Sequence, residues 1–353
     1  MLGRWRSRLE RFVEQRTNNR QLQFDIDFYR LSVLALLHQG VDAPTIEQRL
    51  LSMRPQAHYQ LAYRYYLSET QRLLSRVHAD TAGAGVANVY PAAVAALQSP
   101  TAAPLAGDAV MARQQRRDVA SSKRAAAHET RRHAHPDGFA LVIQRSSIVH
   151  DEAGYGVFVD GTARAGQLLA LYAGRVVAPP ELSAQIVERN DYMVSFYSGW
   201  IIDGREWFRR GANFDERLAS VIDAGMAPPT SLAPTLPYRN PLGVGSLVNH
   251  APPNVQPNVA FCELEIDPKE LAPEVAMLLP NDVAPPSSLT SRFVWHEADG
   301  GKRRTMALVA LREVRDGELF LNYRLNPALA VPDWYWQPDV DAAARRWTRP
   351  TVF

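Results

Sequence analysis

Residues 245–250 read Gly-Ser-Leu-Val-Asn-His, so an amide and an imidazole follow directly after a short apolar run. This stretch is the middle of three blocks that occur far apart but in a fixed order. The first is GYGVF at residues 154–158, a glycine turn, and the last is GELFLNY at residues 317–323, which ends in a tyrosine. Only the tertiary fold can join such widely separated blocks into one site. We expect that fold to bring the three blocks together. The turn of Gly154, Tyr155 and Gly156 would then lie beside Asn249, His250 and the hydroxyl of Tyr323.

The composition is that of a globular protein without a strong charge bias. The chain has 353 residues, enough for about two domains, and 46% of them are hydrophobic. Its net charge of +2 gives no global attraction to nucleic acid or to a membrane. The single cysteine, Cys262, excludes an intrachain disulfide and a zinc site built on several thiolates. The single cysteine leads us to predict no metal site. The apolar stretches are far shorter than the ~20 residues that span a bilayer, so we also predict no membrane segment.

The N-terminus has some features of an organellar address. Four arginines occur within residues 4–11, but Glu10 and Glu14 interrupt the segment, whereas transit peptides are poor in acidic residues. We therefore expect an intracellular protein of the nucleus or cytoplasm, with mitochondrial import as the alternative.

Residues 1–80 are predicted to form a helical N-terminal region. Apolar residues recur at helical spacing from Phe24 to Ala35, and Gly40 is a plausible stop. Thr45 followed by Gln48 has the form of a capping box. A third helix carries an aromatic stripe between Tyr59 and Val77, which is typical of helix–helix packing rather than of a site.

Residues 81–136 lack such periodicity. Ala, Gly and Pro dominate the first half, and a basic cluster with seven Arg and Lys residues occupies 113–132. Such a composition buries too little apolar surface to offset the entropy of ordering, so we predict a disordered linker. The basic cluster is typical of a solvated segment, with a weak nucleic-acid contact as the alternative.

From Phe139 onward the pattern changes to short apolar and β-branched runs of strand length. Ser198-Gly199 suits a two-residue hairpin turn. Residues 211–237 and 268–300 are rich in Pro, Ser and Ala and indicate long loops. The predicted strands are Leu168–Tyr172, Tyr192–Tyr197, Trp200–Ile202, Val259–Leu264, Thr305–Leu311 and Leu319–Tyr323.

A series of short motifs occurs in order through residues 139–325. They are Gly154-x-Gly156, Tyr172-Ala173-Gly174, Tyr192, Ile202-Asp203, Asn249-His250, Pro257-Asn258, Ala310-x-Arg312, Gly317-Glu318 and Tyr323. On these motifs, residues 139–325 resemble a SET domain, the fold of the S-adenosylmethionine-dependent protein-lysine methyltransferases. Residues 240–249, the long insert before them and the Asn322-Tyr323 ending are most similar to the SET domain-containing protein 9 branch. An aromatic C-terminal tail follows at 326–353.

The resemblance implies an α+β, β-rich fold of small sheets with a pseudoknot, after helices. It also implies a methyltransferase that uses S-adenosyl-L-methionine to modify a lysine exposed on a protein or peptide substrate. The Gly154–Gly156 turn would contact the methionine part of the cofactor, and Asn249 and His250 would bind its adenosine. Tyr323 would act in catalysis and contact the cofactor, and Tyr192 would form a second wall of the lysine channel.

Each of these blocks also has a purely structural interpretation. An isolated Gly-x-Gly is typical of a plain hairpin turn, and a buried amide–imidazole pair can serve only to tie two chain segments together. Tyr192 suits cross-strand packing equally well. The tail around Trp334 either covers the pocket or packs elsewhere on the surface.

The chain departs from the family pattern on both sides of the predicted site. Ala251-Pro252 replaces the usual Ser-Cys after Asn-His, and one acidic residue, Glu318, stands where most relatives have two. Because a one-residue slip on a strand reverses its faces, a bulge would be needed to keep Tyr323 directed at the cofactor. These departures favour an alternative: a catalytically degenerate SET-fold module that binds cofactor or peptide without turnover.

Overall fold

The computed structural model describes nine segments of the chain. The arginine-rich N-terminus, the basic cluster up to residue 131 and the insert at 211–237 lie outside them, and so do the predictions made for those parts. The described residues are 19–83, 132–150, 153–178, 192–204, 240, 242–276, 278–283, 301–328 and 330–347.

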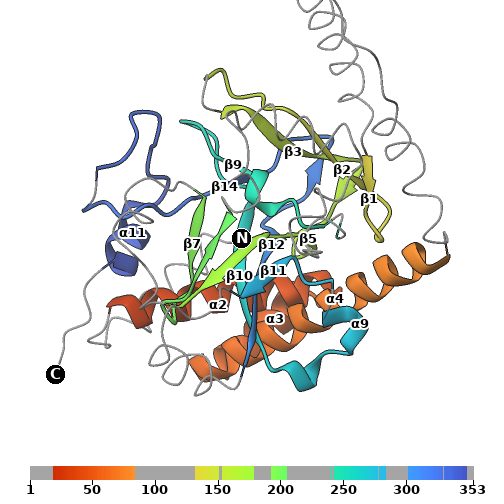
Figure 1. Cartoon of the computed structure of the whole chain (residues 1–353). Coiled ribbons are helices and arrows are strands. Elements are labelled where there is room, and N and C mark those ends of the chain that lie inside the picture. Colours follow the sequence, from red (N-terminus) through yellow and green to blue (C-terminus); the bar gives the residue numbers. More distant parts are fainter. Residues whose placement is uncertain are drawn as a thin grey trace, which may run out of the picture.

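Three helices, α2 (Asn19–His38), α3 (Ala43–Leu51) and α4 (Pro55–Gly83), form the N-terminal region. α2 and α4 pack along each other beneath the strands (Figure 1). Their apolar stripes are removed from water, and Leu34 and Tyr66 are at most 1% exposed. The Tyr66 hydroxyl donates to the carbonyl of Gly166, 3.2 Å away, so the helices pack directly against the β-rich part.

The central sheet is antiparallel and buried. Its order is β10 (Val259–Ile266), β12 (Arg303–Ala310) and β5 (Leu168–Leu171). α4 contacts both β10 and β5, so the helices cover one face of this sheet. The core includes residues of β12 from Met306 to Ala310, each at most 1% exposed.

Four further sheets have two to four strands each. Most of their strand pairs are antiparallel, but β14 runs parallel to β9 and β11 runs parallel to β6. The α+β class with small sheets, predicted from the sequence, is confirmed; the pseudoknot stays a prediction. The strands are β1 (Arg132–Ala134), β2 (Ala140–Arg145) and β3 (Tyr155–Asp160); β11 (Asn281–Val283), β6 (Gly174–Val177), β8 (Ile201–Asp203) and β7 (Met193–Ser195); β13 (Val314–Arg315) with β4 (Thr162–Ala163); and β14 (Phe320–Leu321) with β9 (Asn249–His250).

Four short helical elements complete the described chain. η5 (Gly245–Leu247) precedes β9 and packs against β3, while η6 (Pro268–Glu270) and α9 (Pro273–Ala276) follow β10. α11 (Val340–Trp347) lies near the C-terminal end and packs on α2 (Figure 1). None of the helices in the described segments combines the length and apolar character needed to cross a membrane.

Two local predictions were wrong. The N-cap of α3 is Asp42, whose carboxylate accepts from the Thr45 amide at 3.0 Å, so Thr45 lies inside the helix. The β7–β8 hairpin has a three-residue loop, because Phe196 donates its N–H to Trp200 and Gly199 adopts φ +90°. A loop of this length needs a left-handed residue in its last position, which glycine supplies.

The other corrections concern segments read as loop or linker. β11 lies within the predicted 268–300 loop and forms the edge strand beside β6. α4 continues to Gly83, and β1 begins at Arg132, so both ends of the 81–136 segment are regular structure.

Candidate functional site

The three sequence blocks lie next to one another in the structure. β14 pairs in parallel with β9, with Phe320 opposite Asn249 and Leu321 opposite His250. The first block reaches the same place because Phe158 in β3 forms an isolated bridge with Glu318. The tertiary fold therefore joins segments that are far apart in the sequence, as the site hypothesis requires.

Glu318 is the centre of this junction. Its side chain is buried, with 6% of the residue exposed. Oε1 accepts from Ser146 Oγ at 2.7 Å, and Oε2 accepts from the N–H and hydroxyl of Ser147 at 2.7 and 2.6 Å. A weaker contact of 3.3 Å joins Oε1 to Asn249 Nδ2. A buried carboxylate with this many donors is held in one position.

The two glycines of the first block serve different purposes. Gly154 adopts φ +53°, a left-handed conformation that favours glycine, and its carbonyl accepts from the Ser146 N–H at 3.0 Å. Gly156 has no positive φ, but a β-carbon there would lie 2.1 Å from Oε1 of Glu318. Gly154 is needed for the turn, and Gly156 is needed for the close approach of the carboxylate.

Asn249 ties the first two blocks together through one half of its amide. Nδ2 donates to the carbonyl of Tyr155 at 3.0 Å. Oδ1 has no hydrogen-bond partner within the described segments. The buried hydroxyl of Ser246 in η5 likewise has no partner there. Asn249 Nδ2 is therefore hydrogen-bonded, whereas Asn249 Oδ1 and the Ser246 hydroxyl have no partner in the described segments.

The hydrogen bonds of His250 assign its tautomer. Nδ1 accepts from the N–H of Tyr323 at 3.2 Å, and Nε2 lies 2.8 Å from the carbonyl of Trp336. Only a neutral ring with the proton on Nε2 satisfies both partners. Burial lowers the pKa of His250, although its contacts with Trp336 and Leu321 act in the opposite direction. The imidazole is therefore a neutral bridge between β9, the end of β14 and the tail.

Tyr323 lies directly beside His250. Their ring centroids are 5.3 Å apart, and the Tyr323 hydroxyl donates to the carbonyl of Val248 at 3.2 Å. Two oxygen atoms, the phenol oxygen and this carbonyl, thus meet at the end of the third block. The segment that contains Tyr323 is therefore fixed at both its main chain and its side chain.

The C-terminal tail packs on this same place. Tyr335 stacks on His250 with centroids 4.5 Å apart, and Trp334 meets Tyr323 edge-on at 6.2 Å. Trp336 donates its Nε1–H to the carbonyl of Ala251 at 2.7 Å. The tail therefore packs on His250 and Tyr323, two of the predicted site residues.

Tyr172 bonds the main chain of Tyr192, the second predicted catalytic tyrosine. The Tyr172 hydroxyl donates to the carbonyl of Tyr192 at 2.8 Å. Burial raises the pKa of Tyr172 well above its ordinary value, and Tyr323, Asp203 and Tyr192 add to that effect. Tyr172 therefore stays a neutral phenol between the two predicted catalytic tyrosines.

Three other residues of the junction were not predicted as site residues. Asn258 binds β14 from its second side, donating to the Glu318 carbonyl at 2.7 Å and accepting from the Phe320 N–H at 2.6 Å. Its place in the Pro257-Asn258 landmark was a usable signal. Nothing in the sequence around Ser146 and Ser147 indicated that they would hold a carboxylate.

Within the segments that the structure describes, no three His, Cys, Asp or Glu side chains are grouped to hold a metal ion. A scan against protein-family models and a search of curated proteins both gave no match to this chain.

Proposed function

We propose that the protein is an S-adenosylmethionine-dependent methyltransferase that modifies a lysine side chain of a protein substrate. The observation that carries the proposal is the meeting of the three blocks: Gly156, Asn249 and Glu318 in one cluster, with Tyr323 on His250 beside it. The resemblance of residues 139–325 to SET domains supplies the reaction that this arrangement supports.

The open polar groups suit a nucleoside-like cofactor. Asn249 Oδ1 can accept from a ligand that carries N–H or O–H groups, and the buried Ser246 hydroxyl nearby in the sequence also lacks a partner in the described segments. The Tyr323 phenol and the Val248 carbonyl present two oxygens, which favour a cationic centre electrostatically. Bound S-adenosylmethionine would supply a methyl group activated by the charge of the neighbouring sulfonium.

The protein's own residues would prepare the acceptor. Free lysine has a pKa of about 10.4, so a site that methylates it must favour the neutral amine. Burial among Tyr172, Tyr192 and Tyr323 would disfavour the ammonium form by removing water. The Tyr323 hydroxyl would orient the amine, and such positioning lowers a barrier by several kcal/mol (about 7–11 at most).

One observation favours the second candidate, a SET-fold module without turnover. The Asn249 amide nitrogen donates within the protein, and both carboxylate oxygens of Glu318 accept hydrogen bonds within the protein. This is the arrangement expected if the amide–imidazole pair serves only to tie the segments together. A binding module of this kind needs S-adenosylmethionine or a peptide as ligand but no transfer.

Two measurements on the full chain separate these candidates. S-adenosylmethionine at a hundredfold excess over Kd should add about 2.7 kcal/mol to the free energy of unfolding, because only the folded protein binds it. The melting temperature should rise accordingly. Methyl transfer from labelled cofactor to a panel of lysine-containing proteins then tests turnover. Stabilisation with transfer supports the enzyme, stabilisation without transfer supports the module, and no stabilisation contradicts cofactor binding in both.

A further inference from the structure

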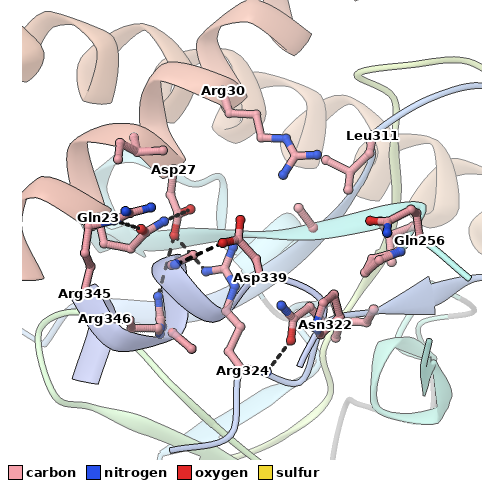
Figure 2. Close-up of a pocket in the computed structure, with 18 of the residues that line it drawn as sticks. Gln23, Asp27, Arg30, Gln256, Leu311, Asn322, Arg324, Asp339, Arg345 and Arg346 are labelled. Carbon is pink, nitrogen blue, oxygen red and sulfur yellow. Dashed lines mark hydrogen bonds and ion pairs between the residues drawn. The ribbon is translucent and has the colours of Figure 1, made fainter. Parts of the chain in front are cut away.

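A separate pocket lies on the other side of the chain that contains Tyr323. It has a volume of about 360 Å³ and is formed by α2, α11, the loop before β10 and the segment that follows β14 (Figure 2). Leu321, Asn322 and Arg324 contribute to its wall. No part of the proposed methyl-transfer function explains this cavity.

The wall of the pocket is positively charged. It contains four arginines and two aspartates, so its formal charge is +2. Figure 2 shows Arg30 extending from α2 toward the middle of the cavity, with the remaining arginines grouped near Gln23 and Asp27. The six charged residues are Arg30, Arg324, Arg345, Arg346, Asp27 and Asp339.

The two carboxylates are already committed to the protein. Asp27 accepts from Arg324 Nη1 and from the Tyr197 hydroxyl, each at 2.8 Å, and from Gln23 at 3.0 Å. Asp339 caps α11 through a bond of 3.0 Å from the Ala342 N–H. Asp27 also lies 3.7 Å from Arg346, so it compensates part of that charge as well as the charge of Arg324.

Donors remain on the arginine side. Arg346 is largely buried, with 10% of its side chain exposed, and its Nη1 is a buried nitrogen without a hydrogen bond in the described part of the chain. That nitrogen lies 3.7 Å from Asp27, a distance for charge attraction only. Arg346 Nη2 lies 3.8 Å from Glu263 and donates to the Ser195 carbonyl at 3.1 Å, so Arg346 is held mainly by the protein itself. Arg345 uses Nε on Gln23 at 3.0 Å, which leaves its terminal nitrogens without a partner among the described residues.

The remainder of the pocket is apolar or carries amides. Val33, Leu311 and Leu321 provide hydrocarbon surface, and Gln256 and Asn322 provide neutral donors and acceptors. A few polar groups in an otherwise apolar cavity of several hundred Å³ are typical of a site for a small molecule. Arginine is also the residue best suited to carboxylate and phosphate groups.

We propose that this pocket binds a small organic anion in which a carboxylate or phosphate group is joined to an apolar body. The acidic group contacts Arg30 and Arg345, and the body covers the hydrocarbon surface of Val33 and Leu311. The volume fits such a molecule and is too small for a folded partner or a nucleic-acid strand.

A matched pair of probes tests the charge requirement on the full chain. 8-Anilino-1-naphthalenesulfonate and N-phenyl-1-naphthylamine share one aromatic body, and only the first carries an acid. Fluorescence titration should give one saturable site for the sulfonate, weaker at higher salt. Phenyl phosphate and 4-phenylbutyrate are then added as competitors, and the stronger of the two identifies the natural acidic group.

Three variants locate that site. Arg30→Gln and Arg345→Gln, on opposite elements, should each weaken sulfonate binding about tenfold, since a charge-assisted hydrogen bond is lost. Arg30→Lys, which keeps the charge, should lose less. Arg315→Gln is the control, because Arg315 is 68% exposed on β13, away from the pocket.

The outcomes divide cleanly. Selective sulfonate binding that both glutamine variants weaken, and that Arg315→Gln leaves unchanged, supports the proposal. Equal binding of the neutral probe, absence of saturable sulfonate binding, or unchanged affinity in Arg30→Gln and Arg345→Gln would overturn it.

Discussion

A β-carbon placed on Gly156 would lie 2.1 Å from the carboxylate oxygen Oε1 of Glu318 and 3.3 Å from Asn249 Nδ2. Glu318 cannot retreat easily, because Ser146 and Ser147 hold both of its oxygens. Gly156→Ala should therefore lower the free energy of unfolding by about 1–3 kcal/mol through overpacking. Urea unfolding followed by tryptophan fluorescence measures the change.

Gly317→Ala is the matched control for that substitution. A β-carbon at Gly317 meets its nearest neighbour at 3.5 Å, an ordinary contact, and its φ is not positive. The free energy of unfolding should change by less than about 1 kcal/mol. If the two alanine variants were equally stable, the position assigned to the Glu318 side chain would be wrong.

The sequence predicted the parts of the fold that depend on local pattern. Helical spacing from Phe24 to Ala35 and the strand-like runs at 259–264 and 305–311 are all found as α2, β10 and β12. The spacing of apolar residues in these segments is enough to predict a helix or a strand, because the apolar face must be buried. The order of the three blocks also predicted which segments would meet.

The parts that the sequence did not predict depend on tertiary pairing. β11 forms a strand because it pairs in parallel with β6. The Pro-rich sequence around it had predicted a loop. The role of Ser146 and Ser147 depends on the position of Glu318, more than 170 residues away. Asp42 and Thr45 are both favourable caps, and only the start of α3 distinguishes them.

His250 should behave as a neutral imidazole in the folded protein. Its pKa is lowered by burial, so the native state binds that proton less readily than the unfolded chain does. Stability from this group is present above the unfolded pKa of about 6.5 and is lost as the pH falls below it. Long-range ¹H–¹⁵N spectra should show the Nε2–H tautomer at pH 7, and a measured pKa above 6.5 would contradict the assignment.

Glu263 should have the opposite kind of pH dependence. Burial raises the pKa of Glu263 to about 7, despite Arg346 and the Tyr197 N–H, which lower it. The folded state then holds a proton that the unfolded chain releases near 4.5, so stability falls as the pH rises through about 7. Glu263→Gln should remove this loss and stabilise the protein at pH 8 by on the order of 2–3 kcal/mol.

The measurement is urea unfolding of wild type and Glu263→Gln between pH 5 and 8. The two curves should converge at pH 5 and separate toward pH 8. Glu313→Gln is the control, because Glu313 is 58% exposed and its ion pair among the described residues is with the exposed Arg315. A difference between wild type and Glu263→Gln that is constant with pH would contradict the raised pKa.

Tyr323→Phe tests the catalytic part of the proposed function. The phenol oxygen donates to the Val248 carbonyl, and the ring contacts with His250 and Trp334 do not need the hydroxyl. The variant should therefore lose little stability, about 1 kcal/mol, and keep its affinity for S-adenosylmethionine. Methyl transfer should fall by about a hundredfold or more, as expected when an oriented electrostatic contact is removed.

Tyr335→Phe provides the comparison for that result. Its hydroxyl lies in the same aromatic group but accepts from the Leu325 N–H at 3.2 Å and from Gln337 at 2.8 Å. Removing it should lower stability without a specific loss of transfer. Equal transfer rates in Tyr323→Phe and wild type would exclude the phenol from catalysis, whereas equal losses in both variants would indicate that the aromatic group acts only through packing.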